Sequence, residues 1–156
     1  MNKKGIRIMM LILGLFVFSV DTTPYQQLKR ASSQRWASNS RIGARPHYQY
    51  LGPDEESIAL SGTLYPELTG GQQDLAMLNA MALSGKPYAL LSGNGEALGL
   101  WVIEQVEETH SHFHRNGAAR KIAFNLSLKR VDDDKAQPAT LGGFVNQLIN
   151  ENSLIA

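Results

Sequence analysis

The chain has no cysteine among its 156 residues and almost no excess of either charge. The first absence excludes disulfides, thiolate metal sites and cysteine nucleophiles. The second follows from 15 Lys and Arg against 14 Asp and Glu, a net charge of +1. No basic footprint for nucleic acid therefore dominates the sequence. What is present, 43% hydrophobic and 19% charged residues, is typical of one globular domain with its own core.

Long hydrophobic runs are also absent, apart from the thirteen residues from Ile8 to Val20. This run is short of the roughly 20 residues that span a bilayer. Three basic residues precede it and small Ser19 lies near its end, a pattern typical of a secretory signal. The same residues, rich in Phe, Val and Leu, suit a β-strand that begins after an internal start at Met9 or Met10. The basic residues are Lys3, Lys4 and Arg7.

Catalytic and metal-binding motifs are scarce. His110, His112 and His114 would share one face of a strand, about 7 Å apart at each step of two, and His-x-His pairs bind zinc or copper. A metal site needs further ligands and a second shell, and the other histidine, His47, is distant in the sequence. These three are weak metal candidates. The chain has no phosphate-binding glycine loop and no G-x-S-x-G element, so we predict no catalytic residue and no cofactor.

The first half of the chain predicts a polar loop followed by one strand and one helix. Residues 22–56 are polar, contain three prolines and show no helical stripe, so they predict a loop with short extended pieces. Residues 57–66 alternate apolar and polar side chains, which predicts a half-buried strand. Residues 71–84 place leucines at helical spacing before Gly85, which predicts a packed helix capped by that glycine.

The second half predicts a long hairpin. Residues 98–114 form an extended run, and residues 121–131 alternate cleanly with Ile, Phe and Leu on one side. A two-residue turn at Asn116 and Gly117 would place Val106 opposite Ser127, an apolar residue against a polar one. We therefore expect an odd loop or a bulge that shifts the register by one residue.

Together these elements predict an α+β fold. The expected architecture is an antiparallel sheet or barrel-like sandwich with a long hairpin, one packed helix at about 71–84 and a short C-terminal helix. The C-terminal helix rests on an apolar stripe. Its residues are Leu141, Phe144, Val145, Leu148 and Ile149.

Six stretches occur in an order and spacing that resemble the tail protein U (GpU) family of contractile-tailed temperate bacteriophages. The resemblance covers about Met9 to Asp133, and the part after Asp134 departs from it. The stretches are "GLFVF", "PYQQLKR", "QRWASNSRIGARP", "YLGPD", "LSGTLYPELTGG" and "GAARKIAFNLSLKRVD".

The resemblance implies a non-enzymatic structural component that is needed for tail assembly, without a cofactor. It implies a place at the baseplate end of the tail tube, as an adaptor or tube initiator, in a virion tail assembled in the bacterial cytoplasm. The expected partners are other tail proteins of the tube, baseplate or hub and further copies of the chain in a ring, possibly a hexamer. No specific nucleic acid and no membrane are implied.

The resemblance also divides the chain. Residues 1–8 are expected to be a spurious N-terminal extension, 9–134 a single tail-protein domain and 135–156 a C-terminal helical segment. On this division the apolar run is the first strand of the domain. The alternative is a secreted or envelope-associated binding protein whose leader is cleaved as a signal peptide.

Subunit contacts are expected on two segments, the hairpin 98–131 and the basic segment 30–46. Arginine and aromatic side chains dominate the desolvated centres of interfaces. Trp36 could instead fill the core, and the basic and aromatic residues could follow a nucleic-acid backbone, although the net charge disfavours that. The interface candidates are Arg30, Arg35, Trp36, Arg41, Arg45, Phe113, Arg115 and Asn116.

Overall fold

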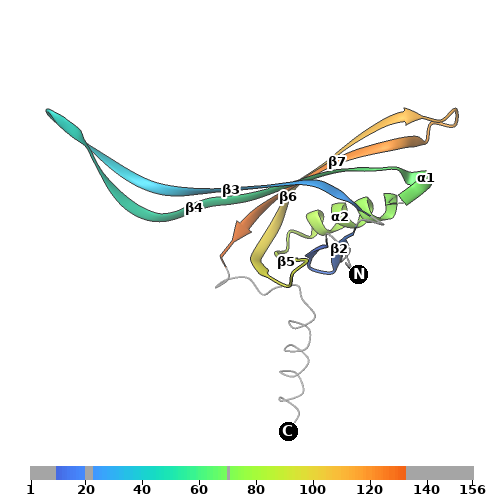
Figure 1. The fold of residues 1–156 in the computed structure, drawn as a ribbon, viewed down its shortest axis with the longest axis horizontal. Coiled ribbons are helices and arrows are strands. Elements are labelled where there is room, and N and C mark those ends of the chain that lie inside the picture. The colour runs from blue at the N-terminus through green and yellow to red at the C-terminus, as the bar shows by residue number, and fades with distance from the viewer. Residues whose placement is uncertain (1–9, 20–22, 70, 133–156) are drawn as a thin grey trace, which may run out of the picture.

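The protein folds as one open, seven-stranded antiparallel sheet with two helices beneath it (Figure 1). This computed structural model describes residues 10–19, 23–69 and 71–132. The strand order is β2-β1-β5-β6-β7-β4-β3, and each neighbouring pair is antiparallel. The elements are β1 (Leu11–Leu13), β2 (Phe16–Phe18), β3 (Tyr25–Arg41), β4 (Ala44–Leu64), α1 (Pro66–Thr69), α2 (Gln72–Ser84), β5 (Tyr88–Ser92), β6 (Ala97–Phe113) and β7 (Ala119–Val131).

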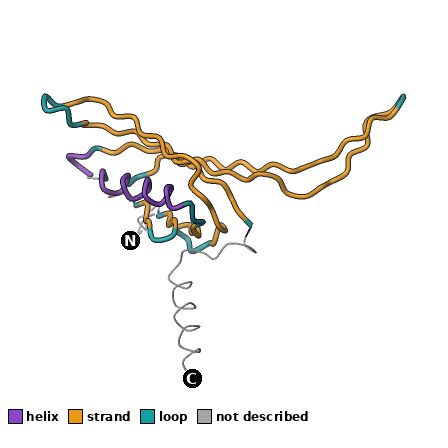
Figure 2. The backbone as a smooth tube through the Cα atoms, turned by 180° about the vertical axis from the view of Figure 1, so that it is seen from behind, coloured by secondary structure: helices purple, strands orange, loops and turns teal. Residues whose placement is uncertain are grey.

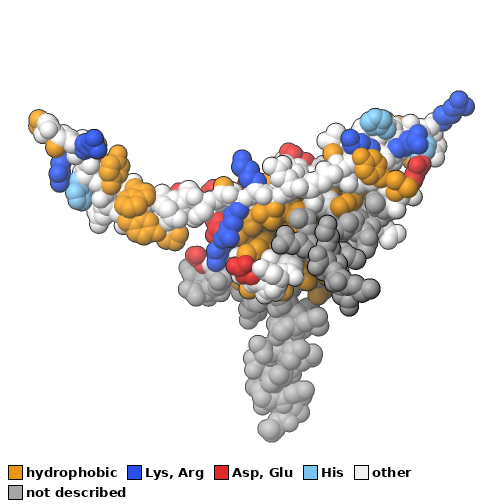
Figure 3. All heavy atoms as spheres, in the orientation of Figure 1, with side chains coloured by type: hydrophobic (Ala, Val, Ile, Leu, Met, Phe, Trp, Pro, Cys, Tyr) orange, Lys and Arg blue, Asp and Glu red, His pale blue; other side chains and the backbone are white. Residues whose placement is uncertain are grey.

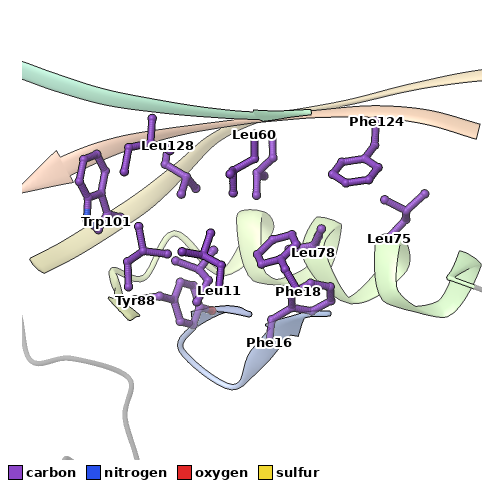
Figure 4. Close-up of a cluster of buried hydrophobic side chains, with 14 of the residues drawn as sticks. Leu11, Phe16, Phe18, Leu60, Leu75, Leu78, Tyr88, Trp101, Phe124 and Leu128 are labelled. Atoms are coloured by element: carbon purple, nitrogen blue, oxygen red, sulfur yellow. The ribbon is translucent and has the colours of Figure 1, made fainter. Parts of the chain in front are cut away.

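The core lies between the inner face of β4, β6 and β7 and a lower layer made by α2, β1 and β2 (Figure 4). Leu75 and Leu78 of α2 are buried against it, and Gly85 ends this helix with a left-handed φ of 64°, as the sequence predicted. Alternate residues of β4 and β7 supply the upper layer, because successive side chains of a strand point to opposite faces. They are Ile58, Leu60, Leu64, Ile122, Phe124, Leu126 and Leu128.

The apolar run near the N-terminus forms part of this core. It folds as the tight hairpin of β1 and β2 around Gly14, whose φ of 61° favours glycine, so it makes two short strands where one was expected. Loss of the residues up to Ser19 would remove four core side chains that are each at most 3% exposed. These side chains are Leu11, Leu13, Phe16 and Phe18.

The loop predicted for residues 22–56 is wrong, because its described residues form all of β3 and more than half of β4. β3 and β4 pair, with several shifts of register, out to Arg41 and Ala44, where Ile42 and Gly43 make the turn. Beyond the Ser32–Glu56 pair, β4 has only β3 as a neighbour among the described residues. A proline on such a strand interrupts no second ladder, so Pro46 and Pro53 are tolerated there.

We call residues 33–55 the arm. It projects from one side of the sheet, while the end of the β6–β7 hairpin projects from the other side (Figures 1 and 2). Register shifts interrupt the β3–β4 ladder at Ser32/Gln34, Arg35/Trp36 and Asn39/Arg41. Such shifts bend a two-stranded ribbon and increase its twist.

The β6–β7 hairpin confirms the predicted shift of register. Phe113 pairs with Ala119, so the loop between them has five residues, an odd number. As a result Val106 faces Leu126, and the apolar side chains of the two strands share the inner face. A further irregularity lies between Ile103 and Gln105.

The predicted α+β class is wrong. Strands make up 67% of the structure and helices 14%, and the strands form a single open sheet with edges at β2 and β3. The error has a physical source: a ribbon exposed on both faces has no one-sided burial, so its sequence carries no strand periodicity. The C-terminal helix expected at 135–156 lies outside the described residues. None of the helices within the described ranges is long and apolar enough to cross a membrane.

Candidate assembly surface

The arm is exposed on both of its faces. From Gln26 to Leu51, every residue except Ala37 is exposed. An isolated two-stranded ribbon is at best marginally stable in water, because it has no third layer against which to bury side chains. The arm therefore gains little stability from burial within the described part of this chain.

An aromatic strip runs along one face of the arm and consists of Trp36, Tyr48 and Tyr50, which are 56%, 60% and 51% exposed. Trp36 pairs with Tyr50 and Ser38 with Tyr48, which places the three rings on one face. The ring centroids of Trp36 and Tyr50 are 5.0 Å apart, and the Tyr50 hydroxyl donates to Gln34 Oε1 at 2.8 Å. Exposed apolar clusters of this kind mark interaction surfaces.

Beyond its base the arm carries charge of one sign, because its two acidic residues, Asp54 and Glu55, lie at the base. Residues 25–53 contain no Asp or Glu. Arg35, Arg41 and Arg45 lie on the arm, and within the described residues none of them has an ion-pair partner. Figure 3 shows basic and hydrophobic side chains gathered along the arm. The arm thus combines unpaired guanidinium groups with exposed rings, the residue types that dominate interface centres.

The inner side of the arm's base carries a partly buried carboxylate between two arginines. Glu56 pairs with Arg30 of β3 and accepts a hydrogen bond from Arg130 Nη1 of β7 at 2.8 Å. Its side chain is only 14% exposed. Burial acts to raise the pKa of Glu56, but the hydrogen bonds from Arg130 and Arg30 outweigh it and the pKa is lowered.

The outer side of the base carries a second ion cluster. Lys129 Nζ of β7 lies 3.3 Å from Glu55 Oε1 of β4 and 3.2 Å from Glu104 Oε1 of β6. Hydrogen bonds to Glu104 and Glu55 raise the pKa of Lys129. The two clusters tie β3, β4, β6 and β7 together where the arm leaves the body.

Two long strands have an unpaired edge. β3 has β4 on one side and no strand on the other among the described residues. β6 pairs with β5 from Ala97 to Trp101. From Val102 to Phe113, the edge of β6 that faces away from β7 has no strand partner among the described residues. Unpaired edges present free N–H and C=O groups to an incoming strand. The sheet can therefore be extended by another chain at two places.

The three histidines do not converge on one point. His110 Nε2 lies 3.1 Å from Glu108 Oε2, and His114 contacts Glu67. His112 has a φ of 55°, which breaks the alternation of the strand, and its Nδ1 lies 3.3 Å from Ser111 Oγ. Among the described residues no group of three His, Asp or Glu side chains is placed to hold a metal ion.

The predicted interface residues fall in two places at opposite ends of the molecule (Figure 1). Arg35, Trp36, Arg41 and Arg45 lie on the arm, and Arg30 lies at its base. Trp36 is outside the core, which contains Trp101 instead. The other three lie at the far end of the β6–β7 hairpin, where Phe113 is 60% exposed. They are Phe113, Arg115 and Asn116.

Sequence reasoning considered Tyr48 and Tyr50 only as aromatics that could stack on nucleic-acid bases and did not count them among the interface residues. Their signal was the pairing of 34–41 with 44–53 about a turn at Ile42 and Gly43. That turn lacks the Asn-Gly or Asp-Gly sequence that identifies most two-residue hairpin loops. Without the turn, the two tyrosines cannot be placed beside Trp36.

Comparison with solved structures finds the same fold in gene transfer agent (GTA) particles. A chain of the virion of a native GTA particle has a TM-score of 0.55 and 13% identity, with coverage of 85% of this chain and 95% of that one. A chain of the tail of an empty GTA particle with C6 symmetry has a TM-score of 0.54 and 9% identity, with coverage of 84% and 96%. At these identities the likeness concerns the fold alone.

Sequence comparison identifies the family. A probable tape measure protein of Halomonas phage phiHAP-1 is 38% identical over 122 residues, which are 78% of this chain but only 14% of the relative's length. The family model Phage P2 GpU matches residues 14–133. The resemblance found in the sequence is confirmed, and the chain belongs to the Phage P2 GpU family of phage tail proteins.

Proposed function

We propose that this structural tail protein forms a non-enzymatic ring at the baseplate end of the tail tube, where it acts as an adaptor or tube initiator. The ring consists of copies of the chain joined edge to edge, with six copies as the expected number. The arm and the end of the β6–β7 hairpin make its contacts with neighbouring subunits and with the tube.

The observation that carries this proposal is the arrangement of the two unpaired edges. The β3 edge lies on one side of the long strands and the β6 edge on the other. When the β3 edge of one copy pairs with the β6 edge of the next, the sheet continues across the interface. A repeated head-to-tail contact of this kind closes into a ring when its rotation divides a full turn.

The two faces of the sheet also suit a ring. The inner face is covered by α2, β1 and β2, so it needs no further partner. The outer face carries small and polar side chains, none of them fully buried, which can remain in contact with water when neighbouring sheets join. These side chains include Ser57, Ser61 and Thr63 of β4 and Asn125 and Ser127 of β7.

The comparisons support six copies and a position in the tube only indirectly. The tail of the empty GTA particle, which contains a chain of this fold, has C6 symmetry. The phiHAP-1 relative carries a similar segment within a protein named for the tape measure of a tail. Both are tail components, which favours a place in the tail axis for this chain as well.

Native mass spectrometry of the full chain tests the proposal. We expect a closed oligomer, with six copies as the principal species, alone or after addition of purified tube protein. The matched variant replaces residues 33–55 with Asn-Gly between Ser32 and Glu56, which face each other in the ladder. It should keep the circular dichroism spectrum of a folded sheet and lose the oligomer. A wild-type protein that stays monomeric under both conditions would contradict a ring.

A further inference from the structure

A groove lies between α2 and the outer half of β6. Its volume is about 270 Å³. The floor is apolar, because Leu75 and Ile122 belong to the core, and polar side chains form the rim. The groove opens beside the stretch of β6 that has no second strand partner. Its lining residues include Leu75, Ala76, Asn79, Glu108, His110 and Ile122.

Among the described residues, two carboxylates on this stretch of β6 lack a Lys or Arg partner. Glu108 accepts a hydrogen bond from Asn79 Nδ2 at 2.9 Å and contacts His110. Glu107 accepts from Gln105 Nε2 at 2.6 Å. Within the described residues neither has a Lys or Arg ion pair, unlike Glu56 and Glu104. As neighbours on a strand, Glu107 and Glu108 lie on opposite faces of the sheet.

The tip of the arm is complementary to this site. Ile42 occupies the turn and is fully exposed, at 106% relative exposure, so its apolar side chain is not buried against any described part of this chain. Arg41 pairs with Ala44, so Arg41 and the following Arg45 lie on opposite faces of the ribbon. The tip thus presents one apolar side chain between two unpaired cations. The groove presents an apolar floor beside the carboxylate of Glu108, and the carboxylate of Glu107 lies on the opposite face of the same strand.

The arm cannot reach the groove of its own chain, because it projects away from α2 (Figures 1 and 2). We propose that the arm tip of one copy docks into the α2–β6 groove of a second copy. Ile42 covers the apolar floor, Arg41 pairs with the carboxylate of Glu108, and Arg45 pairs with that of Glu107. Because tip and groove are different surfaces of one chain, the contact is head-to-tail and is compatible with closure into a ring.

This inference rests on the proposed ring and specifies one of its contacts. Disulfide trapping tests it without background, since the chain has no cysteine of its own. Ile42→Cys and Ala76→Cys are placed on two chains of different length, co-expressed, purified and oxidised. Both positions are exposed, so neither substitution disturbs the core. We expect a disulfide between the two chains in at least about half of the assembled material, as proximity in a fixed complex requires.

The matched control is Leu83→Cys in place of Ala76→Cys. Leu83 is 89% exposed on the same helix and does not line the groove. Equal trapping with Leu83→Cys, or none with Ala76→Cys while native mass spectrometry still shows the oligomer, would overturn the docking and leave the ring standing. In the latter case the tip contacts a different tail protein. A chain that remains monomeric would contradict both the docking and the ring.

Charge reversal gives a second, independent readout. Glu108→Arg and Arg41→Glu, each alone, should weaken self-association about tenfold or more, because each sets like charges against one another. When the two variants are co-expressed, opposite charges face each other again at every contact between unlike chains. Recovery of oligomer in the mixture supports the pairing, and oligomer yields that stay at the level of the single variants refute it.

Discussion

The two tryptophans of this chain offer a direct test of the division between body and arm. Trp101 is fully buried, and its Nε1 donates to the Leu98 carbonyl at 3.0 Å. Trp36 is 56% exposed and touches Tyr50 across the ribbon. The same substitution at both sites, Trp36→Ala and Trp101→Ala, should therefore have opposite consequences for folding and for assembly.

The structure sets the size of the two effects on folding. Trp101→Ala leaves a large cavity in the core that also contains Leu128, and replacements of this kind cost about 3–5 kcal/mol in the free energy of unfolding. Trp36→Ala removes one aromatic pair, worth about 0.5–1.5 kcal/mol. That loss is confined to the arm, which can open without unfolding the body. The global transition should hardly move.

Assembly should show the reverse order. An aromatic anchor at the centre of an interface contributes about 2 kcal/mol or more, so Trp36→Ala should reduce self-association at least about thirtyfold. The assays are urea unfolding followed by far-ultraviolet circular dichroism and sedimentation velocity over a range of concentrations. Trp101→Phe retains Trp36 as the single tryptophan, and its fluorescence maximum should shift to shorter wavelength when the chain assembles.

Two results would refute this reasoning. One is a loss of more than about 3 kcal/mol of folding free energy in Trp36→Ala, which would place that ring in the stabilising core. The other is unchanged sedimentation of a folded Trp36→Ala variant. That would remove the aromatic strip from the assembly surface.

Three further predictions concern the body. The stabilisation from Glu56 is fully present above the pKa of a glutamate in the unfolded chain, about 4.3, and is lost as the pH falls through the lower pKa of Glu56 in the folded protein. The urea midpoint of Glu56→Gln should therefore depend less on pH, below about pH 5, than that of the wild type. Gly62→Ala places a Cβ 2.8 Å from the Phe124 ring and against the Pro24 carbonyl, and it should lower the free energy of urea unfolding by about 1–3 kcal/mol. Zinc added to the folded protein should leave the melting temperature unchanged, since residues 110–114 do not converge on a metal; a stoichiometric rise would contradict that.

Much of the body could be predicted from the sequence because its elements are buried on one side. The alternation in β7 identified its four inward side chains, and leucine spacing with a terminal glycine identified α2. The register of β6 on β7 followed from the cost of placing Val106 opposite Ser127. In each case one-sided burial in the core produces a regular spacing of apolar residues, and this spacing predicts the element.

The arm could not be predicted because nothing in this chain buries it. Polar residues occupy both of its faces, and prolines at positions 46 and 53 indicate loop by every local rule. The position of Trp36 opposite Tyr50 depends on a turn and on one register shift between Asn39 and Arg41. Hydrophobic periodicity in a sequence indicates burial within one chain. A surface that is buried only between chains can be recognised in the sequence by its composition alone. Here that signal is a stretch of arginine and aromatic residues without acids.

The ion clusters at the base explain how an exposed ribbon can still serve as a docking element. A freely hinged arm would lose conformational entropy on every contact, which reduces affinity. Glu56 between Arg30 and Arg130 holds the inner side of the base, and Lys129 between Glu55 and Glu104 holds the outer side. Because the clusters act on opposite faces of one sheet, they resist bending in either direction. The arm is thus aligned before its partner arrives, although its tip gains its own stability only from that partner.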